Sequence, residues 1–418
     1  KRGGEMKNAI VIGAGASGLT AAYFAAKNKN VSVTLIEKND RPARKLMITG
    51  KGRCNVTNNC DLRTLLDNVT KNEKFLYSAF SSFSSSDTTE LFKTLGVPLK
   101  TERGNRVFPV SDKSLVIVDA LVNAVKKEKC KIRKGTVKEI KAENGIVYEA
   151  VLSNGEKINA DYIVLATGGV SYPLTGSTGD GYKMAQKLGI KVTELLPSLV
   201  PFECREGFCS HLSGLTLKNI KLSVFENESK KPVFEELGEL LFTHFGISGP
   251  LVLSASAKMR KKGASYKAVI DLKPALTPEM LDARILRDFS SEPNLNFSNS
   301  LSKLVPKSLI PVIIKLSHID GKTKLNQISK KERQDLCLIL KNLTLHVEGL
   351  RPIEEAIITS GGIDVKEINP RTMQSKKFEN LYFCGEIIDV DALTGGFNLQ
   401  IAFSTGYLAG KSISENGE

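Results

Sequence analysis

Residues 9–38 read AIVIGAGASGLTAAYFAAKNKNVSVTLIEK, and this stretch decides the fold. The apolar run Ala9–Ile12 predicts a buried parallel strand, and a helix of small residues is expected over about Ser17–Lys29. Between them stand three glycines in the G-x-G-x-x-G spacing. A second run of β-branched residues, Val31–Ile36, ends on Glu37. Strand, glycines, helix, strand and terminal acid in this order are typical of a βαβ unit.

Each part of this unit has a physical role in dinucleotide binding. Gly13 permits the tight turn from strand to helix, Gly15 lets the backbone approach a pyrophosphate, and Gly18 lets the helix pack closely on the strands. The start of the helix offers unpaired N–H groups and a partial positive charge to phosphates. Glu37 follows Gly18 by 19 residues, where a carboxylate can accept hydrogen bonds from ribose hydroxyls. A lone glycine motif also fits a surface turn, but the complete unit predicts dinucleotide binding.

The composition is that of an ordinary globular protein. Its 418 residues suffice for two or three domains, and 41% of them are hydrophobic. We find no apolar run of about 18 residues, so no membrane partner is expected, and the first residues lack the apolar segment of a secretory signal. The net charge of +14 can attract nucleic acid. The lysines are scattered, however, which favours a solvated surface and disfavours a nucleic-acid partner.

The cysteines and histidines form no metal or redox motif. The seven cysteines are odd in number and include no C-x-x-C, which argues against a disulfide scaffold, a zinc site and a redox dithiol. The four histidines show no metal-ligand spacing. We therefore expect no metal site, and a reducing cytoplasm as the location.

The segment after Glu37 turns polar and carries glycines and cations. Residues 50–55 read GKGRCN. The glycines allow close approach of a ligand to the backbone and the cations suit phosphates, so a cofactor role is favoured over an exposed basic turn. Cys54 is expected to be a small packed residue, because no histidine lies nearby in the sequence to activate it.

Helices and strands alternate through the rest of the first half. Helices are expected over 72–97 with a capping interruption at Ser81–Ser86, over 113–128 and near 179–188. Strands that alternate in the antiparallel manner are expected over 131–140, 146–152 and 157–159. A buried strand over 162–165 ends in ATGG, and a second glycine-rich loop, TGSTGDG, follows.

The pattern changes beyond about residue 191. Short strands are expected over 215–225 and 267–272, helices within 277–341, and a further strand over 343–349. From Ile357 the glycine-rich style returns. A buried strand over 381–384 leads to a Gly-Glu pair, and a Gly-Gly pair then opens a helix running to Gly410. We infer a nucleotide-binding domain built from both ends of the chain, with residues of about 191–350 inserted.

Longer motifs carry a resemblance to a known family. They are GKGRCNVTN (50–58), RVFPVSDKS (106–114), GGVSYPLTGSTGDGY (168–182), LLFTHFGISGP (240–250), ITSGGI (358–363) and YFCGEIIDVDALTGGFNLQIAFSTGYLAG (382–410). They are similar to those of the YhiN/BaiN-type flavoproteins, many of which are named NAD(P)/FAD-dependent oxidoreductase or aminoacetone-oxidase-like protein.

The resemblance implies an α/β fold with a Rossmann-like FAD-binding domain of the glutathione-reductase type. An inserted β-barrel-like domain and a small helical domain complete the implied architecture. The implied boundaries are 1–190 with 357–418 for the FAD-binding domain, 191–276 with 341–356 for the barrel, and 277–340 for the helices.

The resemblance also implies contacts along FAD. The glycine turn holds the pyrophosphate, Glu37 the adenosine ribose, and Val137 lies at the adenine. The helix that begins near Gly396 presents its N–H groups to the flavin ring. The implied cofactor-binding residues are Gly13, Ala14, Gly15, Ala16, Ser17, Gly18, Glu37, Lys38, Arg44, Lys45, Gly50, Gly52, Arg53, Cys54, Asn55, Val137, Ala166, Thr167, Gly168, Gly385, Glu386, Gly396, Asn398, Leu399 and Gln400.

The sequence offers one candidate for acid–base chemistry. His244, in FTHFGISGP, is suited to substrate contact or proton transfer. The alternative is a hydrogen-bonded structural histidine, and Tyr172 is a weaker candidate. A second G-x-G-x-x-G is absent from the sequence, so no dedicated NAD(P)H-binding domain is expected, and a nicotinamide donor would dock transiently.

The leading hypothesis is an FAD-dependent oxidoreductase. Two electrons would pass between the flavin and a small organic substrate or a nicotinamide donor, NAD(P)H. The family has been linked to amine oxidation and to the reduction of steroid-like enones. One alternative is a flavin-bearing RNA-binding or RNA-modifying factor. Another is a redox-sensing flavoprotein without turnover.

Overall fold

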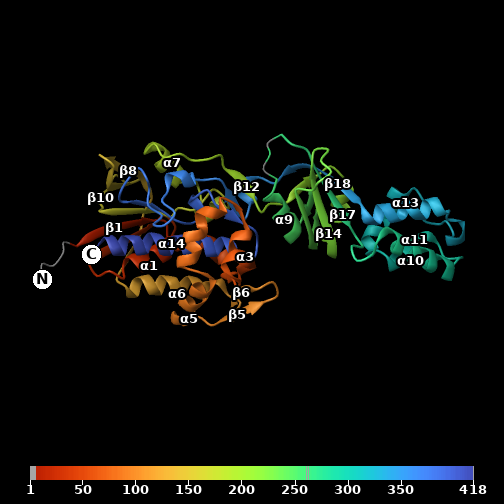
Figure 1. Cartoon of the computed structure of the whole chain (residues 1–418), viewed down its shortest axis with the longest axis horizontal. Coiled ribbons are helices and arrows are strands. Elements are labelled where there is room, and N and C mark those ends of the chain that lie inside the picture. Colours follow the sequence, from red (N-terminus) through yellow and green to blue (C-terminus); the bar gives the residue numbers. More distant parts are fainter. Residues whose placement is uncertain (1–5, 260, 262, 418) are drawn as a thin grey trace. The chain divides into compact units, whose positions relative to one another are not determined.

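The computed structural model describes residues 6–259, 261 and 263–417 (Figure 1). The chain divides into two compact units. The first combines the described residues up to Ser198 with those from Ile353 onward, and the second spans Leu199–Pro352. Residues 1–5 and 418, which the predicted FAD-binding domain includes, lie outside the described part. The division into three domains stays a prediction.

A five-stranded parallel sheet lies at the centre of the first unit. Its order is β20 (Leu381–Phe383), β11 (Tyr162–Leu165), β1 (Lys7–Ile12), β2 (Val31–Glu37) and β7 (Lys131–Lys134). Neighbouring strands pair in parallel throughout. The strand from the end of the chain lies beside β11, so both ends of the chain build one sheet. This confirms the Rossmann-like α/β fold.

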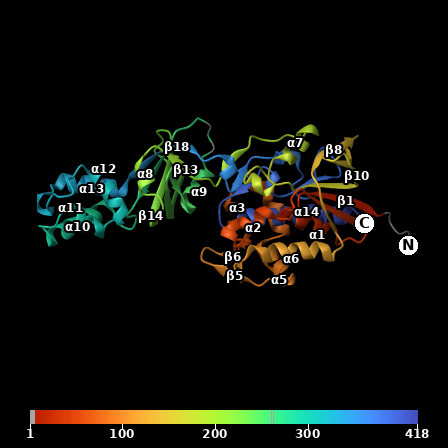
Figure 2. The same cartoon turned by 180° about the vertical axis from the view of Figure 1, so that it is seen from behind.

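Two helices from opposite ends of the chain pack against each other in this unit. They are α1 (Ala16–Ala25) and α14 (Phe397–Asn416), which lie side by side in Figures 1 and 2. A Cβ added to Gly406 would lie 2.5 Å from the Ser17 carbonyl oxygen, and one added to Gly410 would lie 2.4 Å from that of Ala21. The glycines of α14 therefore allow the two backbones to touch.

One predicted strand is divided between two sheets. Residues 131–140 were expected to form antiparallel pairs, but β7 pairs in parallel with β2. Only β8 (Val137–Glu143) joins the antiparallel sheet with β9 (Ile146–Leu152) and β10 (Lys157–Asn159). The chain changes sheet at Gly135, whose N–H donates to the Glu37 carbonyl at 2.9 Å. An alternating pattern does not reveal the direction of a neighbouring strand, which explains the error.

The rest of the first unit surrounds this core. Ser84 caps α5 (Ser85–Thr94) in a capping box with Asp87, as the serine-rich interruption predicts. The other helices are α2 (Arg44–Ile48), α3 (Leu62–Asp67), α4 (Tyr77–Ser82), α6 (Ser114–Lys127) and α7 (Asp180–Lys187). The other strands are β3 (Thr57–Asn58), β4 (Val69–Lys71), β5 (Leu99–Glu102), β6 (Arg106–Pro109), β12 (Leu196–Ser198), β19 (Ile358–Ser360) and β21 (Asp391–Ala392).

The second unit contains a closed barrel, which confirms the expected barrel-like insert. Its strands follow the order β13 (Phe202–Cys204), β16 (Gly246–Ser248), β15 (Phe234–Thr243), β14 (Thr216–Glu226), β17 (Tyr266–Asp271) and β18 (Leu343–Leu350). Pairing of β13 with β18 closes it. Inward-facing residues such as Leu222 and Phe242 are fully buried. The short helices α8 (Phe208–His211) and α9 (Pro250–Ser256) accompany the strands.

Helices follow β17 and precede β18 in the chain. They are α10 (Pro278–Ser291), α11 (Phe297–Ser300), α12 (Ile310–Ser317) and α13 (Lys330–Lys341). Their buried side chains belong to the same apolar cluster as those of the barrel. Lys341 at the end of α13 forms a 2.6 Å ion pair with Asp271 at the end of β17. No helix in the described part of the chain has the length and apolar character needed to cross a bilayer.

Candidate cofactor site

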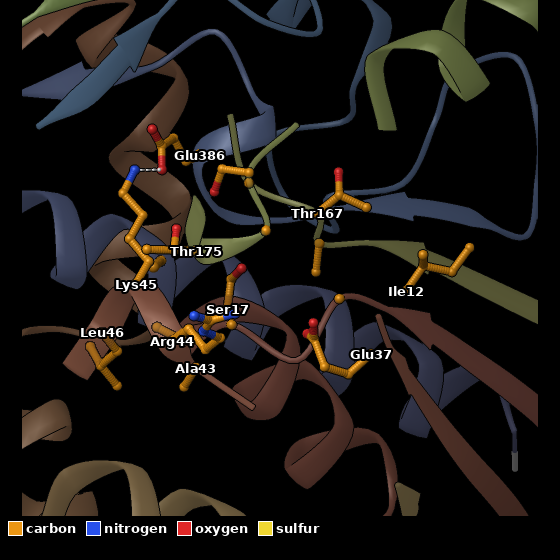
Figure 3. Close-up of a pocket in the computed structure, with 18 of the residues that line it drawn as sticks. Ile12, Ser17, Glu37, Ala43, Arg44, Lys45, Leu46, Thr167, Thr175 and Glu386 are labelled. Carbon is orange, nitrogen blue, oxygen red and sulfur yellow. Dashed lines mark hydrogen bonds and ion pairs between the residues drawn. The ribbon is translucent and has the colours of Figure 1, made fainter. Parts of the chain in front are cut away.

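A large pocket opens in the first unit at the carboxyl ends of β1, β2 and β11 (Figure 3). It holds about 1320 Å³ of empty space, its open mouth included. The start of α1, the helix α2, the start of β8 and the first turns of α14 complete the wall. Ligands bind at this edge in open α/β sheets. The pocket is therefore the candidate site.

Many of the residues expected to bind a cofactor meet in this wall. Those that line the pocket are Gly13, Gly15, Ala16, Ser17, Glu37, Lys38, Arg44, Lys45, Val137, Ala166, Thr167, Gly168, Glu386, Asn398 and Leu399. Other expected residues lie outside the lining, namely Ala14, Gly18, Gly50, Gly52, Arg53, Cys54, Asn55, Gly385, Gly396 and Gln400.

The wall also contains residues that the sequence does not predict, and four of them lie in one segment. Thr175, Gly176, Ser177 and Asp180 line the pocket from the segment before α7 and from its first residue. This segment is the second glycine-rich loop, TGSTGDG, for which the sequence predicts no cofactor contact. Its glycines and its place between a buried strand and a helix were the available signal.

The three glycines of the first turn have three different environments. Gly13 has a φ of +101°, and an added Cβ would lie 2.5 Å from the Ala166 carbonyl oxygen. A Cβ on Gly18 would lie 1.9 Å from the Gly13 carbonyl oxygen. Around Gly15, by contrast, no described atom lies within 4 Å of the added Cβ. Gly13 and Gly18 therefore serve packing, whereas Gly15 borders free space in the pocket.

The start of α1 is electrostatically open. Gly15 is its N-cap and provides no side-chain cap, and the first turn contains no acidic residue. The partial positive charge of the helix end is therefore not offset by a carboxylate of that turn. A pyrophosphate beside Gly15 would meet free space and the uncapped N–H groups of the helix start.

Glu37 is fixed in place at the end of β2. Its side chain is buried, its Oε2 accepts from the Ala14 N–H at 2.8 Å, and its Oε1 accepts from the backbone and side chain of Asn39 at 2.9 and 2.8 Å. A carboxylate has about four acceptor positions. One position on Oε2 therefore remains for a ribose hydroxyl.

Lys38 and Asp180 form a second charged group in the wall. Lys38 Nζ lies 2.7 Å from Asp180 Oδ2, and Thr178 also donates to this oxygen at 2.9 Å. Burial raises the pKa of Asp180, but the hydrogen bonds from Lys38 and Thr178 outweigh it and hold that pKa below its usual value. Lys38 is thus neutralised by a partner within the site.

The Thr167 hydroxyl is buried in the wall without a hydrogen-bond partner among the described residues. An unpaired buried polar atom costs free energy, and a polar ligand atom would remove that cost. The free space at Gly15, the open end of α1, the position left on Glu37 and this hydroxyl all fit the pyrophosphate and ribose of FAD.

Arg53 is not a free cation for phosphates. Its Nε donates to Asp112 Oδ1 at 2.8 Å, it also pairs with Glu102, and its guanidinium lies 4.2 Å from the centre of the Phe108 ring. These contacts hold the loop before β3, in which Lys51 and Cys54 have φ of 58° and 61°. Arg53 therefore supports a strained loop.

Two buried cysteines, Cys54 and Cys384, are unreactive by environment. Cys54 and Cys384 are both 0% exposed. Burial raises the pKa of each thiol to about 12. Both behave as small packed residues, as the sequence predicts for Cys54. The described residues contain no group of three or more His, Cys, Asp or Glu side chains that could hold a metal ion.

Polar side chains at the start of α14 hold the backbone in place. Asn398 accepts from the Ala392 N–H at 2.9 Å and donates to its carbonyl at 2.7 Å. Gln400 is 0% exposed and accepts from the Thr57 and Thr88 hydroxyls at 2.6 and 2.8 Å. These contacts fix the helix end next to the pocket, where Leu399 forms part of the wall.

His244 belongs to the second unit, where it follows β15. Its side chain is exposed, and its ring meets that of Phe245 edge-on at 4.9 Å. Among the described residues its ring has no hydrogen-bond partner, so the alternative of a hydrogen-bonded structural histidine gains no support. Its catalytic role stays a prediction.

Three comparisons with known proteins extend these observations. The chain is 30% identical to the 3-dehydro-bile acid delta(4,6)-reductase of Clostridium scindens over 97% of this chain and 98% of that protein. It is also 30% identical to a ribosomal RNA dihydrouridine synthase of Escherichia coli over 98% of both chains. The structure of a 3-ketosteroid delta1-dehydrogenase from Sterolibacterium denitrificans covers 98% of this chain and 100% of its own, with a TM-score of 0.51 and 12% identity. That likeness shows the fold.

A family comparison covers nearly the same span. The family described as HI0933-like protein Rossmann domain matches residues 7–412. This match takes in most of both segments of the first unit and the whole of the second. The chain therefore belongs to the HI0933-like Rossmann-domain family, which comprises FAD-dependent oxidoreductases of the YhiN/BaiN type.

Proposed function

We propose that this enzyme uses FAD to reduce a carbon–carbon double bond conjugated to a carbonyl group. One observation carries the proposal, namely that two relatives with different substrates match almost the whole chain. A 3-dehydro bile acid with 4,6 double bonds has its alkenes conjugated to the C3 carbonyl. Uridine likewise has its ring double bond conjugated to the C4 carbonyl. The two names therefore share one bond type and one kind of reduction.

The residues of the first unit would hold the cofactor along the strand ends. Gly15 and the start of α1 would bind the pyrophosphate, Glu37 a ribose, and the Thr167 hydroxyl a further polar group. When bound, FAD supplies two-electron redox chemistry that no protein side chain offers. The apolar parts of the wall, among them Leu399 and Met184, would exclude water from the bound cofactor.

A small unsaturated ketone is the first substrate class that we propose, with NAD(P)H as a transient electron donor. A uracil base within RNA is the second candidate. It is favoured by the name of the Escherichia coli relative. Both classes present the same polarised double bond to the pocket.

The test begins with the absorbance spectrum of the purified protein, with FAD added where needed. Anaerobic mixing with NADH or NADPH should bleach the flavin band, and an acceptor should restore it. The acceptors are a 3-oxo-4,6-diene steroid and uridine-rich ribosomal RNA, with products identified by a gain of two mass units. RNA binding that weakens steeply with salt would favour the second class.

Two outcomes contradict the proposal. A protein that refuses FAD contradicts the cofactor. A reduced protein that passes electrons to oxygen but to neither acceptor contradicts the proposed reduction of a conjugated double bond. Oxidation of amines with uptake of oxygen would then be the next activity to test.

A further inference from the structure

The wall of the pocket contains an ion pair whose charged groups are held in position by hydrogen bonds. Lys45 Nζ lies 2.6 Å from Glu386 Oε2, the contact dashed in Figure 3, and 2.6 Å from Ser171 Oγ. Glu386 Oε1 accepts from the Ser171 hydroxyl at 2.9 Å and from the Thr359 N–H at 2.9 Å. Four segments that are distant in the sequence therefore meet at one carboxylate.

The cluster is closely packed. A Cβ added to Gly169 would lie 2.9 Å from Glu386 Oε1 and 2.3 Å from Thr359 Oγ1. The side chains of Lys45 and Glu386 are 22% and 12% exposed, and Ser171 is fully buried. Charges in such surroundings are poorly screened by water and act over longer distances than surface charges.

Lys45 and Glu386 each retain capacity for a further hydrogen bond. An ammonium group has three N–H donors, and Lys45 uses two of them on the described residues. The carboxylate of Glu386 has about four acceptor positions, and the described donors fill three. Both residues line the pocket. A bound cofactor therefore faces one positive and one negative charge, each with remaining capacity.

The other charged residues of the wall have different partners. Glu37 is bound to Ala14 and Asn39, and Lys38 is paired with Asp180. Arg44 also lines the pocket and donates to Asn39 Oδ1 at 3.4 Å. In Figure 3, Glu37 and the Lys45–Glu386 pair lie on opposite sides of the pocket. The pair is thus separate from the carboxylate suited to the ribose.

We propose that Lys45 and Glu386 form an electrostatic balance that sets how readily the bound flavin accepts electrons. This inference rests on the proposed FAD chemistry. The positive charge of Lys45 favours the negative charge that reduction adds, and Glu386 offsets it. Ser171 and Thr359 hold the two charges in place. Removal of either partner leaves the other uncompensated, so the two removals act in opposite directions.

Coulomb's law gives the size of the effect. For an assumed separation of about 10 Å and an effective dielectric of about 20, one unit charge changes the ratio of reduced to oxidised flavin roughly tenfold. For a two-electron couple a tenfold change corresponds to about 30 mV in the midpoint potential. Such a shift is measurable by equilibration with a reference dye.

The experiment compares midpoint potentials of FAD-saturated variants. Lys45→Met should lower the midpoint potential and Glu386→Gln should raise it. Each shift should correspond to a roughly tenfold change in the ratio of reduced to oxidised flavin. Lys45→Arg keeps the charge and should stay near the wild type, and the double variant Lys45→Met/Glu386→Gln should return toward it. Lys27, paired with Glu128 and absent from the pocket lining, provides the control Lys27→Met, which should change nothing.

A merely structural role predicts a different pattern. If the substitutions only loosened the local packing, the midpoint potentials of both single variants would shift in the same direction. The potential of the double variant would then shift furthest. The inference is overturned if the potentials of both single variants shift in the same direction, or if the potential of Glu386→Gln does not shift. The Glu386→Gln result is decisive even if Lys45→Met no longer binds FAD. Wild-type protein that takes up no FAD overturns the proposed function instead.

Discussion

Glu37 accepts a hydrogen bond from the backbone N–H of Ala14 at 2.8 Å, through an oxygen with one acceptor position to spare. This contact ties the end of β2 to the glycine turn that follows β1. The acid that can hold a ribose and the turn that can hold a pyrophosphate are therefore parts of one rigid corner.

Replacement of Glu37 should weaken FAD binding strongly. A hydrogen bond to a charged group contributes about 1.5–3 kcal/mol, so Glu37→Ala should raise the Kd for FAD by roughly 10- to 100-fold. Fluorescence titration of the apoprotein measures the Kd. Glu90→Gln serves as the control, because Glu90 pairs with exposed Lys93 and does not appear in the described lining of the pocket. An unchanged Kd in Glu37→Ala would contradict the role given to this carboxylate.

Replacement by alanine is expected to have opposite effects at Gly15 and Gly18. An added methyl at Gly15 meets no described atom within 4 Å, and the φ of −78° suits any residue. Gly15→Ala should therefore leave the melting temperature within a few degrees of the wild type. It should nevertheless reduce FAD affinity by tenfold or more, because the methyl would occupy the space proposed for the pyrophosphate.

Gly18→Ala, by contrast, should lower the melting temperature. Its Cβ would lie 1.9 Å from the Gly13 carbonyl oxygen, and overpacking of this kind costs about 1–3 kcal/mol or more. Thermal unfolding of the apoprotein separates the two effects, since it involves no cofactor. A pair of variants that lose stability equally would show that Gly15 also serves packing.

The sequence predicted best those features whose cause is local. The spacing of Gly13, Gly15 and Gly18 reflects one turn, so its geometry could be inferred from neighbouring residues. The direction of β7 could not, because it depends on β2, which lies almost a hundred residues earlier in the chain. The partners of Arg53 were hidden for the same reason, since Glu102 and Asp112 follow it by 49 and 59 residues.

The Lys38–Asp180 pair predicts a specific pH dependence of stability. Hydrogen bonds outweigh burial and hold the pKa of Asp180 below its ordinary value of 3.8. The pair therefore stabilises the fold fully above that value, and the contribution is lost as the pH falls through the lowered pKa. Because the pair is partly exposed, it is expected to contribute less than about 1 kcal/mol.

Chemical unfolding of wild type and Asp180→Asn between pH 6 and pH 3 checks this expectation. The wild type should be the more stable protein at pH 6, and the difference should shrink as the solution is acidified. A difference that is constant across the range would mean that the substitution acts through packing.

The cysteines predict a selective pattern of alkylation. Burial raises the pKa of Cys54 and Cys384 to about 12, so at pH 8 only about one thiol in ten thousand at each position is ionised. Iodoacetamide should therefore leave both unmodified in the native protein and modify both after unfolding in urea. Peptide mass spectrometry identifies the labelled positions. Cys60, which is only partly buried and has a pKa raised to about 11, provides an internal comparison and should react faster than either. Rapid native labelling of Cys54 would show that the loop before β3 opens in solution, despite the contacts of Arg53 that hold it.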